Sequence, residues 1–185
     1  AEQEIVERTP DNDTADKVAT IFDNFKQYYE HFDSAMHKVP SAAEDKIGIS
    51  TAEERALTLL RLAGNGEVND ALPYGHKLTK SGINIIESPN NDLIDSSAEA
   101  SADCQMVIVS TGKGTPYSTY VPTIKVASNS ALAEKKKRWI DFDSEKAHSS
   151  EELINFILDI ANGEKTNNEK SGLHGLAIFK IGVTE

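Results

Sequence analysis

The chain has 185 residues, a formal net charge of −11 and one cysteine. Its length is enough for one hydrophobic core, so we expect a single domain over residues 1–185. The acidic surplus disfavours nucleic-acid binding, and no apolar run is as long as a membrane-spanning helix. Cys104 has no disulfide partner within the chain, and the N-terminus lacks the pattern of a signal peptide, so we expect a cytoplasmic protein.

The first half of the chain is predicted to be mainly helical. Apolar side chains recur at helical spacing over Asp13–Phe32, which predicts an amphipathic helix. Ser50–Glu53 has the pattern of a capping box and opens a second helix, which Gly64 ends. The polar stretch after Gly64 is expected to be rich in loops, with a short helix around Val68–Tyr74.

The second half of the chain alternates between predicted strands and helices, which favours a Rossmann-like α/β fold, a mostly parallel sheet with helices on both faces. Lys165–Leu173 is polar and is expected to be mobile. Strands are predicted at Ile83–Glu87, Cys104–Ser110, Thr123–Ala127, Arg138–Phe142 and Leu176–Val183, and helices at Leu93–Ala102, Ala131–Lys137 and from Ser149 or Ser150 to Gly163.

Polar residues follow three of these strands directly. Thr111–Pro116 follows the strand Cys104–Ser110, and Ser128–Ser130 follows the strand Thr123–Ala127. Asp141–Asp143 lies at the end of the strand that begins at Arg138. Ligands of open α/β sheets bind outside the carboxyl ends of parallel strands. We therefore expect these three segments to form the rim of one binding site.

The loop Thr111–Pro116 is the strongest candidate for contact with an anion. Gly112 and Gly114 permit positive φ values and a close backbone approach, and Lys113 between them supplies a positive charge. The spacing matches neither a Walker loop nor a dinucleotide fingerprint. An ordinary tight turn with a solvated lysine is the alternative.

Two further groups of residues are candidates for substrate contact. The Ser88–Asp92 turn precedes a helix N-terminus, where Asn91 and Asp92 offer oxygen atoms to sugar hydroxyls or a hard cation, although the same residues are typical of turns and helix caps. Lys125 lies in an otherwise apolar strand and must reach a partner or a polar cleft. The five histidines are scattered, so no catalytic base or metal ligand can be named.

Several segments carry a family resemblance. The run TGKGTP…VPTIKVASNSALAEKK…WIDFD resembles the C-terminal part of the altronate/galactarate dehydratases. Leu78–Asp92 resembles the family segment that ends in Ser-Pro-Gly-Asn-Asp, and Ile160–Glu164 with Gly175–Glu185 resembles the family's C-terminal end. The likeness is strong over Leu78–Glu185 and faint over Thr9–Gly75.

The resemblance implies the C-terminal domain of a longer sugar-acid dehydratase, a lyase that forms a 2-keto-3-deoxy acid with a divalent metal, Fe²⁺ or Mn²⁺. In this interpretation residues 78–185 are the best-matching core, and residues 1–40 supply an N-terminal helix that packs on it. The partners would be a sugar acid and the remainder of the dehydratase polypeptide, and homo-oligomerisation stays open. The candidate substrate-binding residues are Ser88, Asn91, Asp92, Thr111, Gly112, Lys113, Gly114, Thr115, Lys125 and Asn129.

The chain also departs from the family pattern, so we expect it to be inactive as an isolated piece. The competing hypothesis is a non-catalytic or degenerate module that binds a sugar acid or mediates subunit contacts. A flavodoxin-type or receiver-type domain is disfavoured, because no acidic cluster precedes a Thr and a Lys in receiver order. The departures are Lys113 in place of Arg, Ser118 and Asn90 in place of Gly, PSAAEDKIGIST over Pro40–Thr51 in place of Pro-Gly-Asn and Gly-Gly-x-Thr-Thr, and Arg55-Ala56 in place of Lys-Ser.

Overall fold

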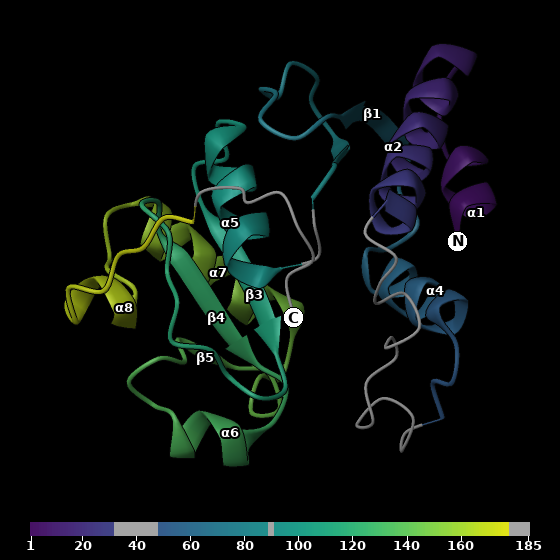
Figure 1. The fold of residues 1–185 in the computed structure, drawn as a ribbon. Coiled ribbons are helices and arrows are strands. Elements are labelled where there is room, and N and C mark those ends of the chain that lie inside the picture. Colours follow the sequence, from purple (N-terminus) through teal and green to yellow (C-terminus); the bar gives the residue numbers. More distant parts are fainter. Residues whose placement is uncertain (32–47, 89–90, 178–185) are drawn as a thin grey trace. The chain divides into compact units, whose positions relative to one another are not determined.

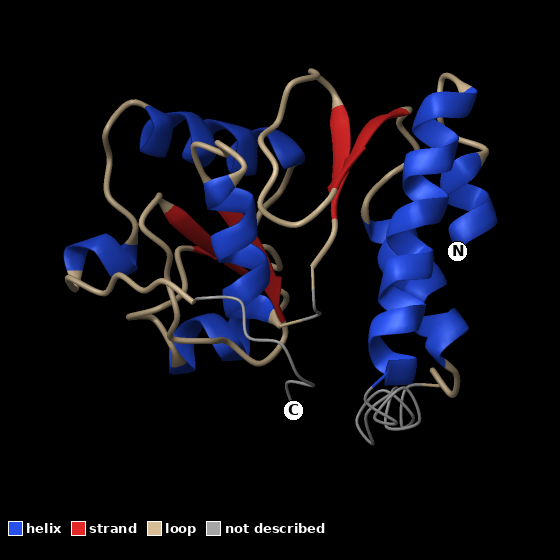
Figure 2. Cartoon of the chain, turned by 45° about the horizontal axis from the view of Figure 1, so that its top comes forward, coloured by secondary structure: helices blue, strands red, loops and turns tan. Residues whose placement is uncertain are grey.

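The computed structural model describes residues 1–31, 48–88 and 91–177, which form two compact units (Figure 1). Unit 1 extends from Ala1 to Pro89, and unit 2 from Asn90 to Phe179. Each unit has its own small parallel sheet, shown in red in Figure 2. The α/β class is therefore confirmed, whereas the Rossmann-like arrangement and the single domain over residues 1–185 stay predictions.

Unit 1 packs helices against a two-stranded parallel sheet. Its helices are α1 (Glu2–Val6), α2 (Asn12–His31) and α4 (Ala52–Leu62), and its strands are β1 (Val68–Leu72) and β2 (Ile83–Ile86). The apolar face of α2 meets the sheet through a buried cluster, so the helical spacing found in the sequence is explained by core packing. The cluster consists of Ile5, Val18, Leu60, Val68 and Ala71.

The prediction of a helix around Val68–Tyr74 is wrong, because Val68–Leu72 forms strand β1. Four of its residues, Val68, Asp70, Ala71 and Leu72, are buried, and the strand pairs in parallel with β2. The pairing partner begins eleven residues after β1 ends. A pattern confined to Val68–Leu72 cannot reveal that partner, and pairing outweighs the weak local preference.

Unit 2 is built around a three-stranded parallel sheet of order β3-β4-β5. Strand β4 matches its prediction residue for residue, whereas β3 starts three residues later than expected. Of the predicted strand Arg138–Phe142 only Phe142 belongs to β5, because the backbone around Trp139 and Ile140 still turns back to Lys136. The elements are α5 (Asp92–Ser101), β3 (Val107–Thr111), β4 (Thr123–Ala127), α6 (Ser130–Lys135), β5 (Phe142–Asp143), α7 (Ser150–Ala161) and α8 (Asn167–Lys170).

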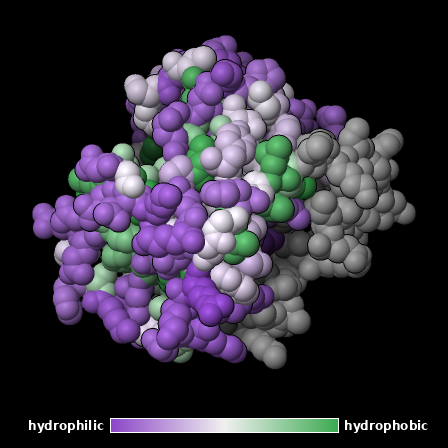
Figure 3. Space-filling view, turned by 90° about the vertical axis from the view of Figure 1, so that its left-hand side faces the viewer, coloured by the Kyte–Doolittle hydropathy of each residue, from purple (hydrophilic) through white to green (hydrophobic). Residues whose placement is uncertain are grey.

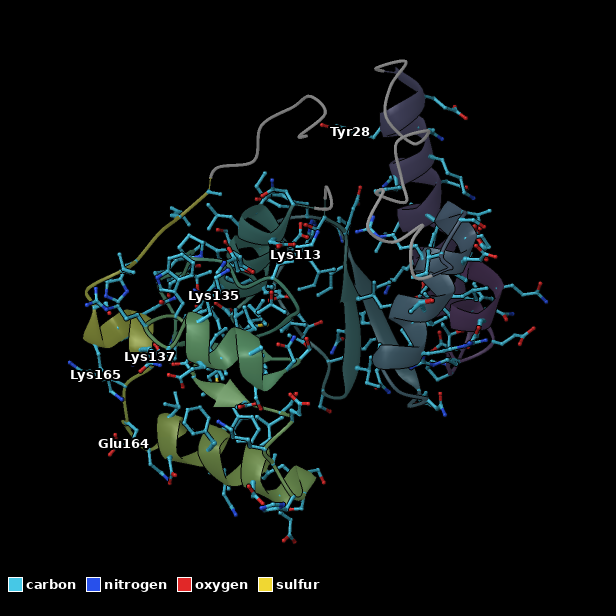
Figure 4. The ribbon with its side chains drawn as sticks, turned by 90° about the horizontal axis from the view of Figure 1, so that it is seen from below. Tyr28, Lys113, Lys135, Lys137, Glu164 and Lys165 are labelled. Atoms are coloured by element: carbon cyan, nitrogen blue, oxygen red, sulfur yellow. The ribbon has the colours of Figure 1, made fainter. Side chains whose placement is uncertain are left out.

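Helices cover both faces of this sheet. Ile124 and Val126 of β4 point to α7, where they pack against Leu153, Phe156 and Ile160. Alternation along the strand places Thr123, Lys125 and Ala127 on the opposite face, the side of α5 and α6 in Figure 4. Strand β4 is thus buried on both sides, which explains its continuous burial.

The polar segment that was expected to be mobile includes one short helix. Lys165–Leu173 contains helix α8, which begins with a full capping box between Thr166 and Glu169. Most of the predicted strand Leu176–Val183 lies outside the described residues. No described helix has the length and apolar content needed to cross a bilayer. On the face shown in Figure 3, hydrophilic side chains predominate and apolar ones form small, separate groups.

Candidate functional site

The polar strand ends predicted from the sequence meet at one edge of the sheet in unit 2. Thr111, Ala127 and Asp143 are register partners across β3, β4 and β5. Because the strands are parallel, the segments that follow them leave at the same edge. The backbone N–H of Ser128 donates to the Thr111 carbonyl at 3.1 Å, and that of Ser144 donates to the Ala127 carbonyl at 3.1 Å.

The glycine loop after β3 is held by its own threonine and by a lysine from α6. The Thr111 hydroxyl accepts from the backbone N–H groups of Lys113 (3.3 Å) and Gly114 (2.9 Å). The Lys136 ammonium donates to the carbonyls of Lys113 (2.8 Å) and Gly114 (3.2 Å). Those two N–H groups are therefore used inside the loop, and anion binding would depend on the exposed side chain of Lys113 (Figure 4).

Asn129, which follows β4, has a structural role at this edge. Its side-chain oxygen accepts from the Leu132 N–H at 2.8 Å and caps α6. The neighbouring Ser130 N–H donates to the Glu145 carboxylate at 2.7 Å. Asn129 therefore lies near the glycine loop, as predicted, but its oxygen is committed to the helix N-terminus.

The residues predicted from the Ser88–Asp92 turn are divided between the two units. Asn91 caps α5, with its side-chain oxygen 3.3 Å from the Ile94 N–H, and Asp92 is the first residue of that helix. Ser88 belongs to unit 1 and follows β2. Its participation in the same site stays a prediction, and Asn90 lies outside the described residues.

Lys125 is fully buried in the middle of β4, and its ammonium nitrogen has no hydrogen-bond partner within the described part of the chain. This nitrogen lies 5.5 Å from the centre of the Tyr117 ring, within range of a cation–π contact. Burial lowers the pKa of Lys125 to about 8, against the opposing effect of Asp141. The sequence indicated that this lysine needs a polar partner, and among the described residues its amine contacts the aromatic ring of Tyr117 without a hydrogen bond.

Asp141 connects β4 to helix α8. One carboxylate oxygen accepts from the Lys125 backbone N–H at 2.8 Å, and the other accepts from the Asn167 N–H at 2.6 Å. Burial raises the pKa of Asp141 despite these hydrogen bonds. The adjacent Asn168 is fully buried, and its amide nitrogen donates to the Tyr117 carbonyl at 3.1 Å.

The sequence analysis did not select Tyr117, Asn167 or Asn168 as site residues. One local signal was present, because Thr166 and Glu169 have the spacing of a capping box, which predicts a helix start and therefore an ordered segment there. Nothing local to Tyr117 indicates its contact with Lys125. That contact depends on the path of the loop between β3 and β4.

The described residues contain no group of three or more His, Cys, Asp or Glu side chains placed to hold a metal ion. Burial raises the pKa of the Cys104 thiol, which disfavours the thiolate. What unit 2 offers is one exposed lysine on the glycine loop and one buried lysine below that edge of the sheet.

Comparison with known proteins gives consistent matches. The family model described as "D-galactarate/Altronate dehydratase, C-terminal" matches residues 1–184. The altronate dehydratase of Escherichia coli (strain K12) is 43% identical over 191 residues, which cover 100% of this chain and 39% of that protein. The altronate dehydratase of Bacillus subtilis (strain 168) is 39% identical over 192 residues, with the same coverage. The chain thus spans about two fifths of the length of these relatives.

Proposed function

Because the chain belongs to the D-galactarate/altronate dehydratase family, we propose that it supplies substrate-binding groups to a sugar-acid dehydratase whose active site is completed by the rest of the polypeptide. The reaction would remove the proton next to the substrate carboxylate and expel the neighbouring hydroxyl as water. The resulting enol would tautomerise to a 2-keto-3-deoxy acid. Such a reaction needs groups that hold the carboxylate and groups that move protons.

The observation that carries this proposal is the glycine loop at the carboxyl edge of β3 and β4. Lys136 fixes the loop backbone through two carbonyls, so the neighbouring Lys113 is presented at a defined position. Lys113 is exposed and offers an ammonium group to a substrate carboxylate in a chain whose net charge is −11. A local positive charge of this kind is needed to hold an anionic substrate against the acidic background.

The divalent metal implied by the resemblance, Fe²⁺ or Mn²⁺, belongs to the same proposal but does not fit the described residues of this chain, which lack a cluster of three suitable ligands. Its ligands would come from other parts of the polypeptide. We therefore derive no step that passes through a metal. The residues described here would bind and orient the substrate.

The test is calorimetric titration of the full-length protein with galactarate and altronate. A charge-assisted hydrogen bond contributes about 1.5–3 kcal/mol, so Lys113→Ala should weaken binding roughly ten- to a hundredfold. Lys135→Ala, an exposed lysine of α6 labelled in Figure 4, is the matched control and should bind as the wild type does. Equal affinity of the wild type and Lys113→Ala would overturn the loop's role.

A second measurement concerns the reaction itself. We expect residues 1–185 alone not to dehydrate galactarate or altronate when Fe²⁺ or Mn²⁺ is added, and the full-length protein to do so. A coupled assay for the 2-keto-3-deoxy acid gives the readout. Product formed by residues 1–185 alone would show that this chain holds the complete site.

A further inference from the structure

Three side-chain atoms of unit 2 are buried without a hydrogen-bond partner among the described residues, and one of them, Asp143 Oδ2, is in an ion pair with Lys146 at 3.5 Å. The other two belong to side chains next to Tyr117. The first is the Lys125 ammonium nitrogen, 5.5 Å from the centre of the Tyr117 ring. The second is the side-chain oxygen of Asn168, whose amide nitrogen is held by the Tyr117 carbonyl at 3.1 Å. Both side chains have no exposed surface.

The orientation of Asn168 follows from its one hydrogen bond. The group that contacts the Tyr117 carbonyl must be the amide N–H₂, because two oxygens cannot form that hydrogen bond. The oxygen is therefore the unpaired atom. Among the described residues, the side chains next to Tyr117 thus leave one cationic donor, on Lys125, and one neutral acceptor, on Asn168, without a hydrogen bond.

Neighbouring groups do not satisfy the amine. Asp141 is the charged side chain that acts on the amine, and both of its carboxylate oxygens accept from backbone N–H groups. Asp92, Asp95 and Glu99 of α5 act on the Tyr117 hydroxyl, and Lys170 of α8 acts on Asp141. The Tyr117 hydroxyl is 3.3 Å from the Ser96 hydroxyl of α5. Most buried polar groups are hydrogen-bonded, and an uncompensated buried cation is strongly unfavourable, so these unpaired atoms require an explanation.

We infer that Lys125 and Asn168 form a subsite for a hydroxylated carboxylate, in which the ammonium group binds a carboxylate oxygen and the amide oxygen accepts a hydrogen bond from an adjacent hydroxyl. Sugar acids carry both groups on neighbouring carbon atoms. The inference rests on the proposed function and extends it from the loop surface to the interior of unit 2. Because Lys125 is fully buried, a ligand reaches it only when the chain around it opens.

The subsite predicts that ligand binding takes up a proton. The pKa of Lys125 is about 8 in the ligand-free chain, so about half of the amine is protonated at pH 8. A carboxylate beside the amine favours the charged form and raises this pKa again. Binding at pH 8 should therefore take up about half a proton, and binding at pH 6.5 close to none.

The experiment is calorimetric titration of the full-length protein with galactarate at pH 8 and pH 6.5, in pairs of buffers that differ in ionisation enthalpy. We expect uptake of about half a proton at pH 8 in the wild type and in the exposed-lysine control Lys135→Met. Lys125→Met should abolish the uptake and weaken binding roughly ten- to a hundredfold. The wild-type uptake is informative even if Lys125→Met fails to fold.

The outcomes separate the two proposals. If the wild type binds galactarate and Lys113→Ala weakens binding, but Lys125→Met retains wild-type affinity and proton uptake, the subsite is refuted and the loop's role stands. If Lys125→Met alone weakens binding and abolishes uptake, the subsite stands without the loop. Absence of uptake in the wild type at pH 8 refutes the subsite and indicates that water satisfies the two atoms. Failure of the wild type to bind either sugar acid refutes both proposals.

Discussion

Replacing Lys125 by Met is expected to stabilise unit 2 near neutral pH. Met has nearly the same length and can fill the same space without a charge. The fall of the pKa of Lys125 from 10.5 to about 8 corresponds, at about 1.4 kcal/mol for each pKa unit, to a destabilisation of roughly 3 kcal/mol in the wild type. Lys125→Met should remove this cost.

The gain should depend on pH in a defined direction. A lysine with a lowered pKa in the folded state imposes its full cost below pH 8, where the folded chain must carry the charge. The cost falls as pH rises and disappears above the unfolded value of 10.5. The advantage of Lys125→Met should therefore shrink from about 3 kcal/mol at pH 7 to about 1 kcal/mol at pH 10.

The assay is urea denaturation of residues 1–185, followed by the fluorescence of Trp139, the sole tryptophan, which lies in unit 2. Lys135→Met removes an exposed lysine of the same unit and should match the wild type at both pH values. A variant Lys125→Met that is less stable than the wild type at pH 7, or whose advantage is the same at pH 7 and pH 10, would refute the reasoning. The amine would then be satisfied inside the fold.

Two further predictions concern the loop and the helix around this site. Gly114→Ala should destabilise unit 2 by about 1–2 kcal/mol in the same denaturation assay. The reason is that Gly114 has φ +73° and that a Cβ there would lie 2.8 Å from the Lys136 side chain. Unchanged stability would show that the loop readily adopts another conformation. Thr166→Ala should lower the free energy of unfolding by about 1 kcal/mol, because the buried Thr166 hydroxyl caps α8 and bonds Glu169. Thr166→Ser keeps the hydroxyl and should retain most of the stability. An equal loss in both variants would assign the effect to packing.

Elements with local signals could be predicted from the sequence. Helix α2 follows from apolar spacing alone, and the start of α5 follows from its capping residue Asn91, since these interactions join positions only three or four residues apart. Strand β4 was predicted exactly because a short apolar run between turn residues is itself a local pattern. The meeting of the glycine loop with Asn129 followed from the rule that parallel strands end at one edge.

Other features depend on contacts between distant segments, and these were missed or incomplete. Strand β1 was expected as a helix because its partner β2 is remote in the sequence, and β5 is short because the backbone before it continues to turn after α6. The sequence places a lysine in β4, but only the fold shows that its amine meets the Tyr117 ring and bonds no carboxylate of the described residues. Partners of a buried charge are set by which loops cross the sheet, and that is a property of tertiary packing.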